Sequence, residues 1–235
     1  MKKISKASEL LWVLGTIFVA LGVSLCSKAN LGVSMIAAPA FIIAEAIPKF
    51  SVGVMEYIVQ GILLIVLCII IRRFRVKYLL AFAVAVIYGY VLDLFLFLLG
   101  DINIYATWLR WVTLLIGDCC VAFGVACFFR TYLPLQVYEL FVSELSDKFK
   151  FNINKTKWVF DISLLIISVT LALTLFGDIG EFNIRTIGHS AFHNIGLGTF
   201  VTTLINSPII NFMGKIIDRC FEKTARFEKV ETLLK

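Results

Sequence analysis

The chain has 235 residues, of which 60% are hydrophobic and only 16% are charged, and its mean hydropathy is +0.94. A soluble domain averages about 45–50% apolar and about 25% charged residues, and its surface must stay polar enough to remain dispersed. This composition therefore excludes a soluble globular fold and favours an α-helical membrane protein. At about 20 residues per span, the chain accommodates about six spans and no separate soluble domain.

The net charge of +6 fits loop lysines and arginines that meet lipid head groups better than it fits a nucleic-acid partner. The six cysteines form no Cys-x-x-Cys pair, and most lie in apolar segments, so we expect neither a disulfide framework nor a zinc site. A basic start precedes an apolar stretch from Leu10 to Leu25 that lacks an Ala-x-Ala-type cleavage site. This pattern predicts an uncleaved first span.

Five segments of about 18–22 residues are long and apolar enough to cross a hydrocarbon core of about 30 Å. They are residues 10–27, 53–71, 78–99, 108–129 and 158–176. A sixth segment, residues 196–213, is more polar, because it contains Thr199, Asn206 and Pro208. We expect this sixth span to face other helices rather than lipid.

The lysines and arginines are distributed unevenly between the two sides that six spans define. Of the 22, only Lys28, Lys49, Arg110 and Arg185 fall on one side, and the remaining eighteen fall on the side of the two termini. Because positively charged loops stay in the cytoplasm, both termini are expected on the cytoplasmic side of a cytoplasmic-type membrane. A missing or extra span would break this alternation, so the distribution supports six spans.

Two connecting segments are too apolar for loops and too short for spans. Residues 29–50 are apolar but interrupted by a glycine and two prolines, and residues 133–149 carry an amphipathic pattern with Glu139 and Glu144 off the apolar face. Helices of this length are typical of interfacial or re-entrant segments. We expect the first on the outer side and the second on the cytoplasmic side, and the pattern leaves open which of the two types they are.

The two halves of the chain resemble each other. Residues 20–23 (Ala-Leu-Gly-Val) correspond to residues 122–125 (Ala-Phe-Gly-Val) at a shift of 102, and with one residue dropped Gln60 overlies Asp161. In the third span, residues 78–81 stand where residues 196–199 stand in the sixth.

Each half then consists of a span, a half-helix and two further spans, over residues 1–106 and 107–217, with a tail at 218–235. Three crossings invert the second copy relative to the first, as in secondary transporters whose solute site lies near the repeat interface. A duplication that only builds a helical bundle is the alternative explanation.

Four short motifs run from the first span to the sixth. They are Leu31-Gly32, Phe50-Ser51-Val52-Gly53, Lys155-x-Lys157-x3-Asp161 and Gly196-Leu197-Gly198-Thr199. Together they resemble the bacterial YczE/YyaS/YitT group over most of the chain, which implies a small inner-membrane protein with a transport-related role. The chain departs from that group in two ways: residues 78–81 do not repeat the Gly-x-Gly-Thr sequence, and no soluble domain follows the sixth span.

Acidic residues inside the spans are the strongest candidates for function, because an acid at the centre of a spanning helix costs about 2.5–3.5 kcal/mol unless a partner, water or a proton compensates. Asp118 lies near the middle of the fourth span and is the leading candidate for a proton or cation site. A structural acid held by neighbouring polar groups is the alternative. Glu56 and Asp161 lie near the starts of their spans, where we expect water to reach them, and Asp93 lies in the outer part of the membrane.

Neutral polar residues extend this candidate cavity. The side chains expected to line it are those of Gln60, Asn206, Asn211 and Thr199, although hydrogen bonds between helices explain the same residues. Asp161 has an alternative role in an ion pair with Lys157, one helical turn earlier. The acidic cavity favours cationic, zwitterionic or proton-coupled ligands.

No pattern in the chain indicates an enzyme, a cofactor or a metal site. His189 and His193 are spaced to share one helix face, with Glu181 as a third ligand, but a solvated external loop explains them as well. The 196–199 motif lacks the lysine of a phosphate-binding loop and follows no strand. No Ser-His-Asp order, metalloprotease motif or kinase motif is present.

The sequence therefore predicts an all-α polytopic membrane helical bundle, with about six spanning helices as two inverted repeats, each with an interfacial or re-entrant half-helix. Its leading function is transport of a small solute or ion through a central polar site. The alternatives are a substrate-binding subunit of a multi-component importer and a non-transporting membrane partner or regulator. A homo-oligomer or a complex with a partner membrane protein fits each of them.

Overall fold

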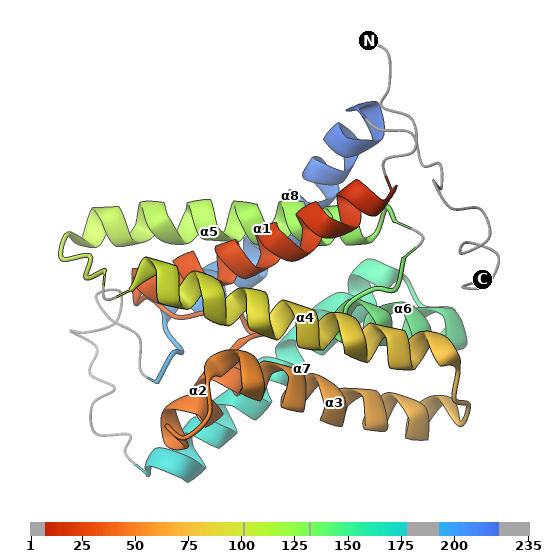
Figure 1. Ribbon diagram of the computed structural model, residues 1–235, viewed down its shortest axis with the longest axis horizontal. Coiled ribbons are helices and arrows are strands. Elements are labelled where there is room, and N and C mark those ends of the chain that lie inside the picture. The colour runs from red at the N-terminus through yellow and green to blue at the C-terminus, as the bar shows by residue number, and fades with distance from the viewer. Residues whose placement is uncertain (1–7, 101, 132, 178–192, 221–235) are drawn as a thin grey trace.

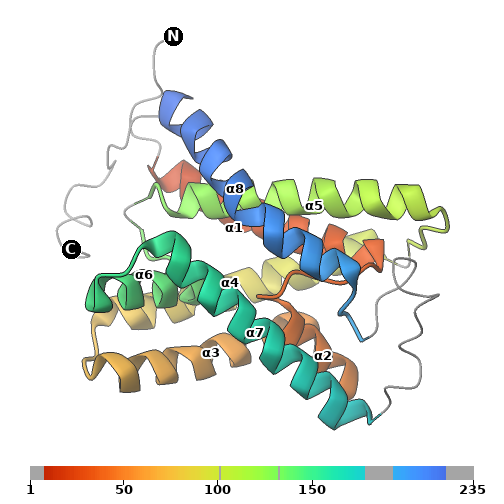
Figure 2. The same cartoon turned by 180° about the vertical axis from the view of Figure 1, so that it is seen from behind.

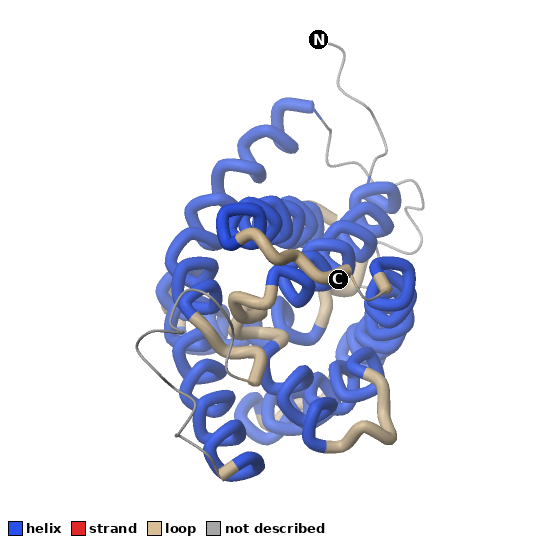
Figure 3. Tube along the Cα trace, turned by 90° about the vertical axis from the view of Figure 1, so that its left-hand side faces the viewer, coloured by secondary structure: helices blue, strands red, loops and turns tan. Residues whose placement is uncertain are grey.

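The computed structural model describes residues 8–100, 102–131, 133–177 and 193–220, and over these residues it contains eight α-helices and no strand (Figures 1 and 3). Six of these helices are long and apolar enough to cross a membrane, which confirms the predicted polytopic bundle. They are α1 (Ser8–Ala29), α3 (Val52–Ile71), α4 (Val76–Leu99), α5 (Thr107–Phe128), α7 (Ile153–Phe176) and α8 (Leu197–Cys220). The two short helices are α2 (Ala38–Ala46) and α6 (Val137–Phe149).

The outer surface of the long helices is apolar. Ile65, Ile69, Phe97 and Ile166 are each more than 60% exposed. A protein surrounded by water rarely exposes so continuous an apolar surface, whereas lipid solvates it. The protein is therefore a multi-pass membrane protein.

The ends of α7 and α8 differ most from the predicted spans. α7 begins at Ile153 rather than at residue 158, because the Asn152 side chain caps it by accepting a hydrogen bond from the backbone N–H of Asn154 at 2.9 Å. Lys157 therefore lies inside the helix. α8 continues to Cys220, seven residues beyond the predicted end of the sixth span.

The short helices α2 and α6 lie at opposite ends of the bundle, which we call the α2 end and the α6 end (Figures 1 and 2). α2 packs against α3 and α7, and α6 packs against α3, α4 and α7. Six of the nine residues of α2 and eight of the 13 residues of α6 are buried. An interfacial helix keeps one face in water or head groups, so this burial favours the re-entrant type.

α1 and α5 run antiparallel through the middle of the bundle with their backbones in close contact. A Cβ atom on Gly22 would lie 2.5 Å from the carbonyl oxygen of Gly117, and one on Gly124 would lie 2.7 Å from the carbonyl oxygen of Gly15. Small residues allow this approach between membrane helices. We call this pair the central layer; α4 packs on α1, and α8 packs on α5.

The α3–α4 pair is closed at the α2 end. A Cβ atom on Gly89 would lie 2.6 Å from the carbonyl oxygen of Gly53. The Asp93 carboxylate accepts hydrogen bonds from the Ser51 hydroxyl at 2.6 Å and from the backbone N–H of Gly53 at 2.8 Å. By contrast, α7 and α8 are not packed along each other and diverge towards the α6 end (Figure 2).

Candidate functional site

Buried polar side chains converge where α6 meets α3 and α7. The Tyr138 hydroxyl donates a hydrogen bond to Oε2 of Glu56 at 3.2 Å, and Glu56 is only 1% exposed. The adjacent Glu139 is 6% exposed, and its Oε2 atom has no hydrogen-bond partner. The Lys157 ammonium group lies 3.2–3.3 Å from the two carboxylate oxygens of Asp161. We call these five side chains the central cluster.

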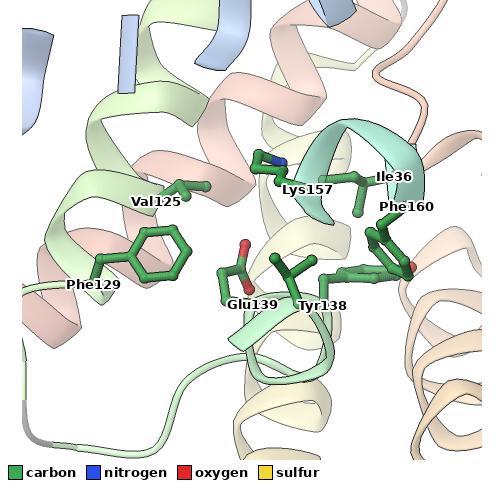
Figure 4. A pocket seen from close by; sticks show the side chains of 8 residues that line it. Ile36, Val125, Phe129, Tyr138, Glu139, Lys157 and Phe160 are labelled. Atoms are coloured by element: carbon green, nitrogen blue, oxygen red, sulfur yellow. The ribbon is translucent and has the colours of Figure 1, made fainter. Parts of the chain in front are cut away.

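Two small cavities adjoin the central cluster, and Glu139 lines both. Their volumes are about 20 and 10 Å³, and a single water molecule needs about 10–15 Å³. Each cavity therefore has room for about one water molecule or a monatomic ion, and not for an organic solute. In the smaller one, the Glu139 carboxyl group and the Lys157 amine point into the same space between α5, α6 and α7 (Figure 4).

The larger of these cavities is lined in pairs by the two halves of the chain. Ten of its 12 lining residues form five pairs, and the members of each pair are separated by the 102 positions that relate the halves in sequence. The pairs are Val19 and Val121, Val23 and Val125, Ser34 and Gln136, Ile36 and Tyr138, and Ala37 and Glu139.

A much larger cavity, of about 310 Å³, opens between α5, α7 and α8 at the α6 end, and we call it the vestibule. This volume is at the lower end of the range of small-molecule sites. Its lining comprises Phe129, Arg130, Ile153, Asn154, Lys157, Ser207, Ile210 and Asn211. Because Phe129 and Lys157 line both the vestibule and the smallest cavity, they form the boundary between the vestibule and the central cluster.

The acids of α6 lie in two electrostatic settings. Burial raises the pKa of Glu139 to about 7, against the opposing effect of the positive charge of Lys157. Burial also acts to raise the pKa of Glu144, but hydrogen bonds from Lys77 and Tyr78 outweigh it and hold that pKa below its ordinary value. Glu144 thus fastens α6 to α4, whereas Glu139 is the acid of this helix that is poised to exchange a proton.

Two of the predicted site residues, Asp118 and Asn206, are brought together. The Asn206 side chain on α8 donates a hydrogen bond to Oδ1 of Asp118 on α5 at 2.9 Å. Asp118 is 1% exposed, and its Oδ2 atom has no hydrogen-bond partner. The hydrogen bond from Asn206 fits a structural acid that is held by neighbouring polar groups. The Oδ2 atom without a partner also fits a proton or cation site.

Gln60 and Asp161 lie on the faces of α3 and α7 that bear the central cluster. Gln60 is fully buried one turn beyond Glu56, and neither atom of its side-chain amide has a hydrogen-bond partner. Asp161 makes the alternative ion pair with Lys157. The expectation that Glu56 and Asp161 lie open to water near the starts of their spans is wrong, because both are buried in the packing of α3 and α7 around the short helices. Glu56 lines the larger of the two small cavities, which has room for about one water molecule.

Asp93 and Thr199 lie outside the central cluster and have structural contacts. Asp93 ties the start of α3 to α4, as described above. The Thr199 hydroxyl accepts a hydrogen bond from the backbone N–H of Gly196 at 3.3 Å at the start of α8. It packs against Gly32, whose φ of 108° and lack of a side chain let the chain before α2 pass this close.

Sequence reasoning did not select Tyr138, Glu139 and Lys157 as site residues. The amphipathic pattern of α6 placed Glu139 off the apolar face, as if it faced solvent, and Lys157 was counted in a loop. One signal was present in the sequence: at the shift of 102, Glu139 overlies Ala37, inside an apolar segment. An acid that stands where the other half has an apolar residue indicates a buried position more clearly than the helical periodicity of its own segment does.

The histidine motif is only partly covered by the described residues. His193 lies 2.7 Å from a carboxylate oxygen of Glu45, and its ring stacks on Phe176. His189 and Glu181 lie outside the described residues. No group of three metal-ligating side chains occurs within the part of the chain that the structure describes.

Comparison with known proteins gives a family without an assigned activity. A family model described as a family of unknown function, DUF6198, matches residues 6–215, which is most of the chain. No curated protein and no solved structure matches the chain.

Proposed function

We propose that this chain, which belongs to the DUF6198 family of unknown function, is a small-solute or ion transporter with a central polar site. The observation that carries this proposal is that a vestibule of about 310 Å³ adjoins a buried cluster of charged side chains between the two halves. Lys157 belongs to the cluster and also lines the vestibule. Solute sites near the interface of two repeats are a common feature of secondary transporters.

The contacts between the halves support an inverted repeat. Gly15 contacts Gly124, and Gly22 contacts Gly117. Gly117 and Gly124 are the counterparts of Gly15 and Gly22 at the shift of 102, so each glycine meets the counterpart of the other. Reciprocal contacts of this kind are those of an interface about a two-fold axis.

Two corresponding places in the halves differ, and this difference supports alternating access. The residues that close α3 against α4 are Gly53, Gly89 and Asp93. At the shifts that align the two halves in sequence, they correspond to Asn154, Ser207 and Asn211, all of which line the open vestibule. One contact is sealed at the α2 end while its counterpart is open at the α6 end, as expected for a transporter that faces one side.

The distribution of basic residues assigns the sides. The α6 end carries the basic loops, so we propose that it lies in the cytoplasm of a bacterial plasma membrane and that the vestibule faces inward. Placing Lys150→Cys in a cysteine-free variant tests this orientation. A membrane-impermeant maleimide is expected to label this position in inverted vesicles and not in intact cells, and labelling in intact cells would reverse the assignment.

The alternating contacts are tested by Gly53→Ala, because the added methyl group prevents closure of α3 against α4. We expect this variant to favour the opposite state, in which the vestibule is closed. The readout is the maleimide labelling rate of Ser207→Cys, a buried vestibule position, in a cysteine-free variant. The rate is expected to fall several-fold with Gly53→Ala.

Gly61→Ala provides the matched control on the same helix pair. A Cβ atom there would meet only the Phe82 ring, at 3.2 Å, and a side chain can move aside where backbone cannot. Labelling is expected to stay unchanged in this control. Equal labelling rates in the two variants would contradict the alternating contacts.

A screen for thermal unfolding of the purified protein with metabolites and ions identifies the solute to test for flux in liposomes. A ligand present at 100 times its dissociation constant stabilises the folded state by about 2.7 kcal/mol, which is a measurable shift. Flux of the stabilising solute supports transport. Tight binding without flux favours the substrate-binding subunit, and the absence of both favours the partner or regulator.

A further inference from the structure

The cavities beside Glu139 limit what that side chain can bind. Their volumes of about 10 and 20 Å³ leave no room for an organic solute, which must occupy the vestibule instead. The ligand of the central cluster is therefore a proton or a small ion. This inference rests on the proposed transport function and concerns its coupling ion.

The Glu139 carboxyl group is built into the site without a complete set of partners. It is more than nine-tenths buried, it faces both cavities, and its Oε2 atom has no hydrogen-bond donor. A carboxylate oxygen in that position is costly, whereas a bound proton removes the charge. The buried, unpaired oxygen is the geometric sign of a protonation site.

The charged and titratable groups that face Glu139 come from several elements. α3 contributes Glu56, α4 contributes Tyr88, α6 itself contributes Tyr138, and α7 contributes Lys157 and Asp161. The side chains of α1 and α5 that line the two cavities are apolar. Together with Glu139, the set contains three carboxylic acids and one base, and the base, Lys157, already forms an ion pair with Asp161.

This set favours a proton over a sodium ion. A metal cation beside Glu139 would be repelled by Lys157, which points into the same space (Figure 4). Within the described residues, no group of three His, Cys, Asp or Glu side chains is arranged to hold a metal ion. A proton needs only the one free oxygen.

We propose that Glu139 carries the coupling proton of transport and that Lys157 controls its release to the vestibule. With Lys157 bonded to Asp161, Glu139 holds the proton on Oε2. When the ammonium group of Lys157 turns from Asp161 to Glu139, the O–H bond breaks, the carboxylate is stabilised, and the proton passes to water in the vestibule. Lys157 lines both the smaller cavity and the vestibule, so it stands between Glu139 and the water of the vestibule. Burial independently places the pKa of Glu139 at about 7, where proton exchange is easiest near neutral pH.

The test is infrared difference spectroscopy of the purified full-length protein, which follows the C=O stretch of protonated carboxyl groups as pH is varied. The wild type is expected to lose carboxyl absorption with a midpoint near pH 7, and the component that is absent from Glu139→Gln is assigned to Glu139. Glu139→Asp, which restores a carboxyl group, is expected to regain a titrating band. Asp147→Asn, the same chemical change at an exposed position of α6, is expected to leave the band unchanged.

Lys157→Gln separates proton control from a merely structural role. Removal of the positive charge that opposes the burial effect is expected to shift the midpoint of the Glu139 band to higher pH. Identical titrating absorption in the wild type and Glu139→Gln, or a midpoint of the Glu139 component that is unaffected in Lys157→Gln, would overturn the proposal. A midpoint that differs between sodium chloride and choline chloride would overturn it too, because sodium would then compete for the site.

The outcome is distinguishable from that of the proposed function. A titrating Glu139 in a protein without flux leaves the proton site standing and removes transport. Flux without a titrating Glu139 keeps transport and removes this coupling site.

Discussion

Glu139 imposes a pH dependence on stability whose sign follows from its pKa. The folded protein raises this pKa from 4.5 to about 7, so between these values the folded state holds a proton that the unfolded state has lost. The stability contributed by the bound proton is complete below pH about 4.5 and is lost as pH rises towards 7. The unfolding temperature in detergent is therefore expected to fall with pH more steeply in the wild type than in Glu139→Gln. Parallel curves for the two proteins would contradict the assignment.

The Asp118–Asn206 contact predicts an asymmetry between two substitutions. Asn206→Ala leaves the buried Asp118 carboxylate without its amide donor, and leaving a buried group unsatisfied costs about 1–3 kcal/mol. Asp118→Asn removes the charge and keeps a hydrogen-bonding side chain in place, so it is expected to cost less. Thermal unfolding of both variants in the same detergent measures the difference. A larger loss in Asp118→Asn would show that the carboxylate itself stabilises the contact.

The α1–α5 contact leaves no space for a larger residue at Gly22. Gly22→Ala would place a methyl group 2.5 Å from the carbonyl oxygen of Gly117 and 2.7 Å from the backbone nitrogen of Val121. Overpacking against backbone costs about 1–3 kcal/mol, so the unfolding temperature is expected to fall. Gly61→Ala, which meets only a side chain, is expected to have a smaller effect. Equal effects of the two substitutions would mean that the central layer is not closely packed.

The helices were the part of the structure that the sequence predicted best. Long apolar runs are unambiguous, and each predicted span overlaps a helix, but the start of α7 depends on a side-chain cap at Asn152 that hydropathy does not register. The short helices were located correctly by their apolar patterns. Their burial follows from packing against α3 and α7, which no local pattern encodes.

The candidate site was only partly predictable for the same reason. Asp118, Asn206, Gln60 and Asp161 were found because polar residues inside apolar spans stand out. Glu139 lies off the apolar face of α6, where the sequence pattern suggests contact with solvent, so its burial became visible only in the packed structure. The structural role of Asp118 depends on Asn206, a partner that lies 88 positions away in the sequence.

On the scale of the whole molecule, a sealed α3–α4 contact at the α2 end coexists with an open vestibule between α5, α7 and α8 at the α6 end. If the halves are inverted copies, exchanging their conformations would close the vestibule and open the α2 end without any new fold. The antiparallel α1–α5 layer would stay fixed, because its glycine contacts are the same in both arrangements.

Pairs of spin labels measure this exchange directly. In a cysteine-free variant reconstituted in lipid, one pair at Lys49→Cys and Leu98→Cys spans α3 and α4 at the α2 end, and another at Lys155→Cys and Lys215→Cys spans α7 and α8 at the α6 end. Between about pH 5 and about pH 8, we expect two populations in each distance distribution. The population with the short α7–α8 distance is expected to increase as the population with the short α3–α4 distance decreases. Distances that stay single and unchanged at both ends would contradict alternating access, and with it the account of this protein as a transporter.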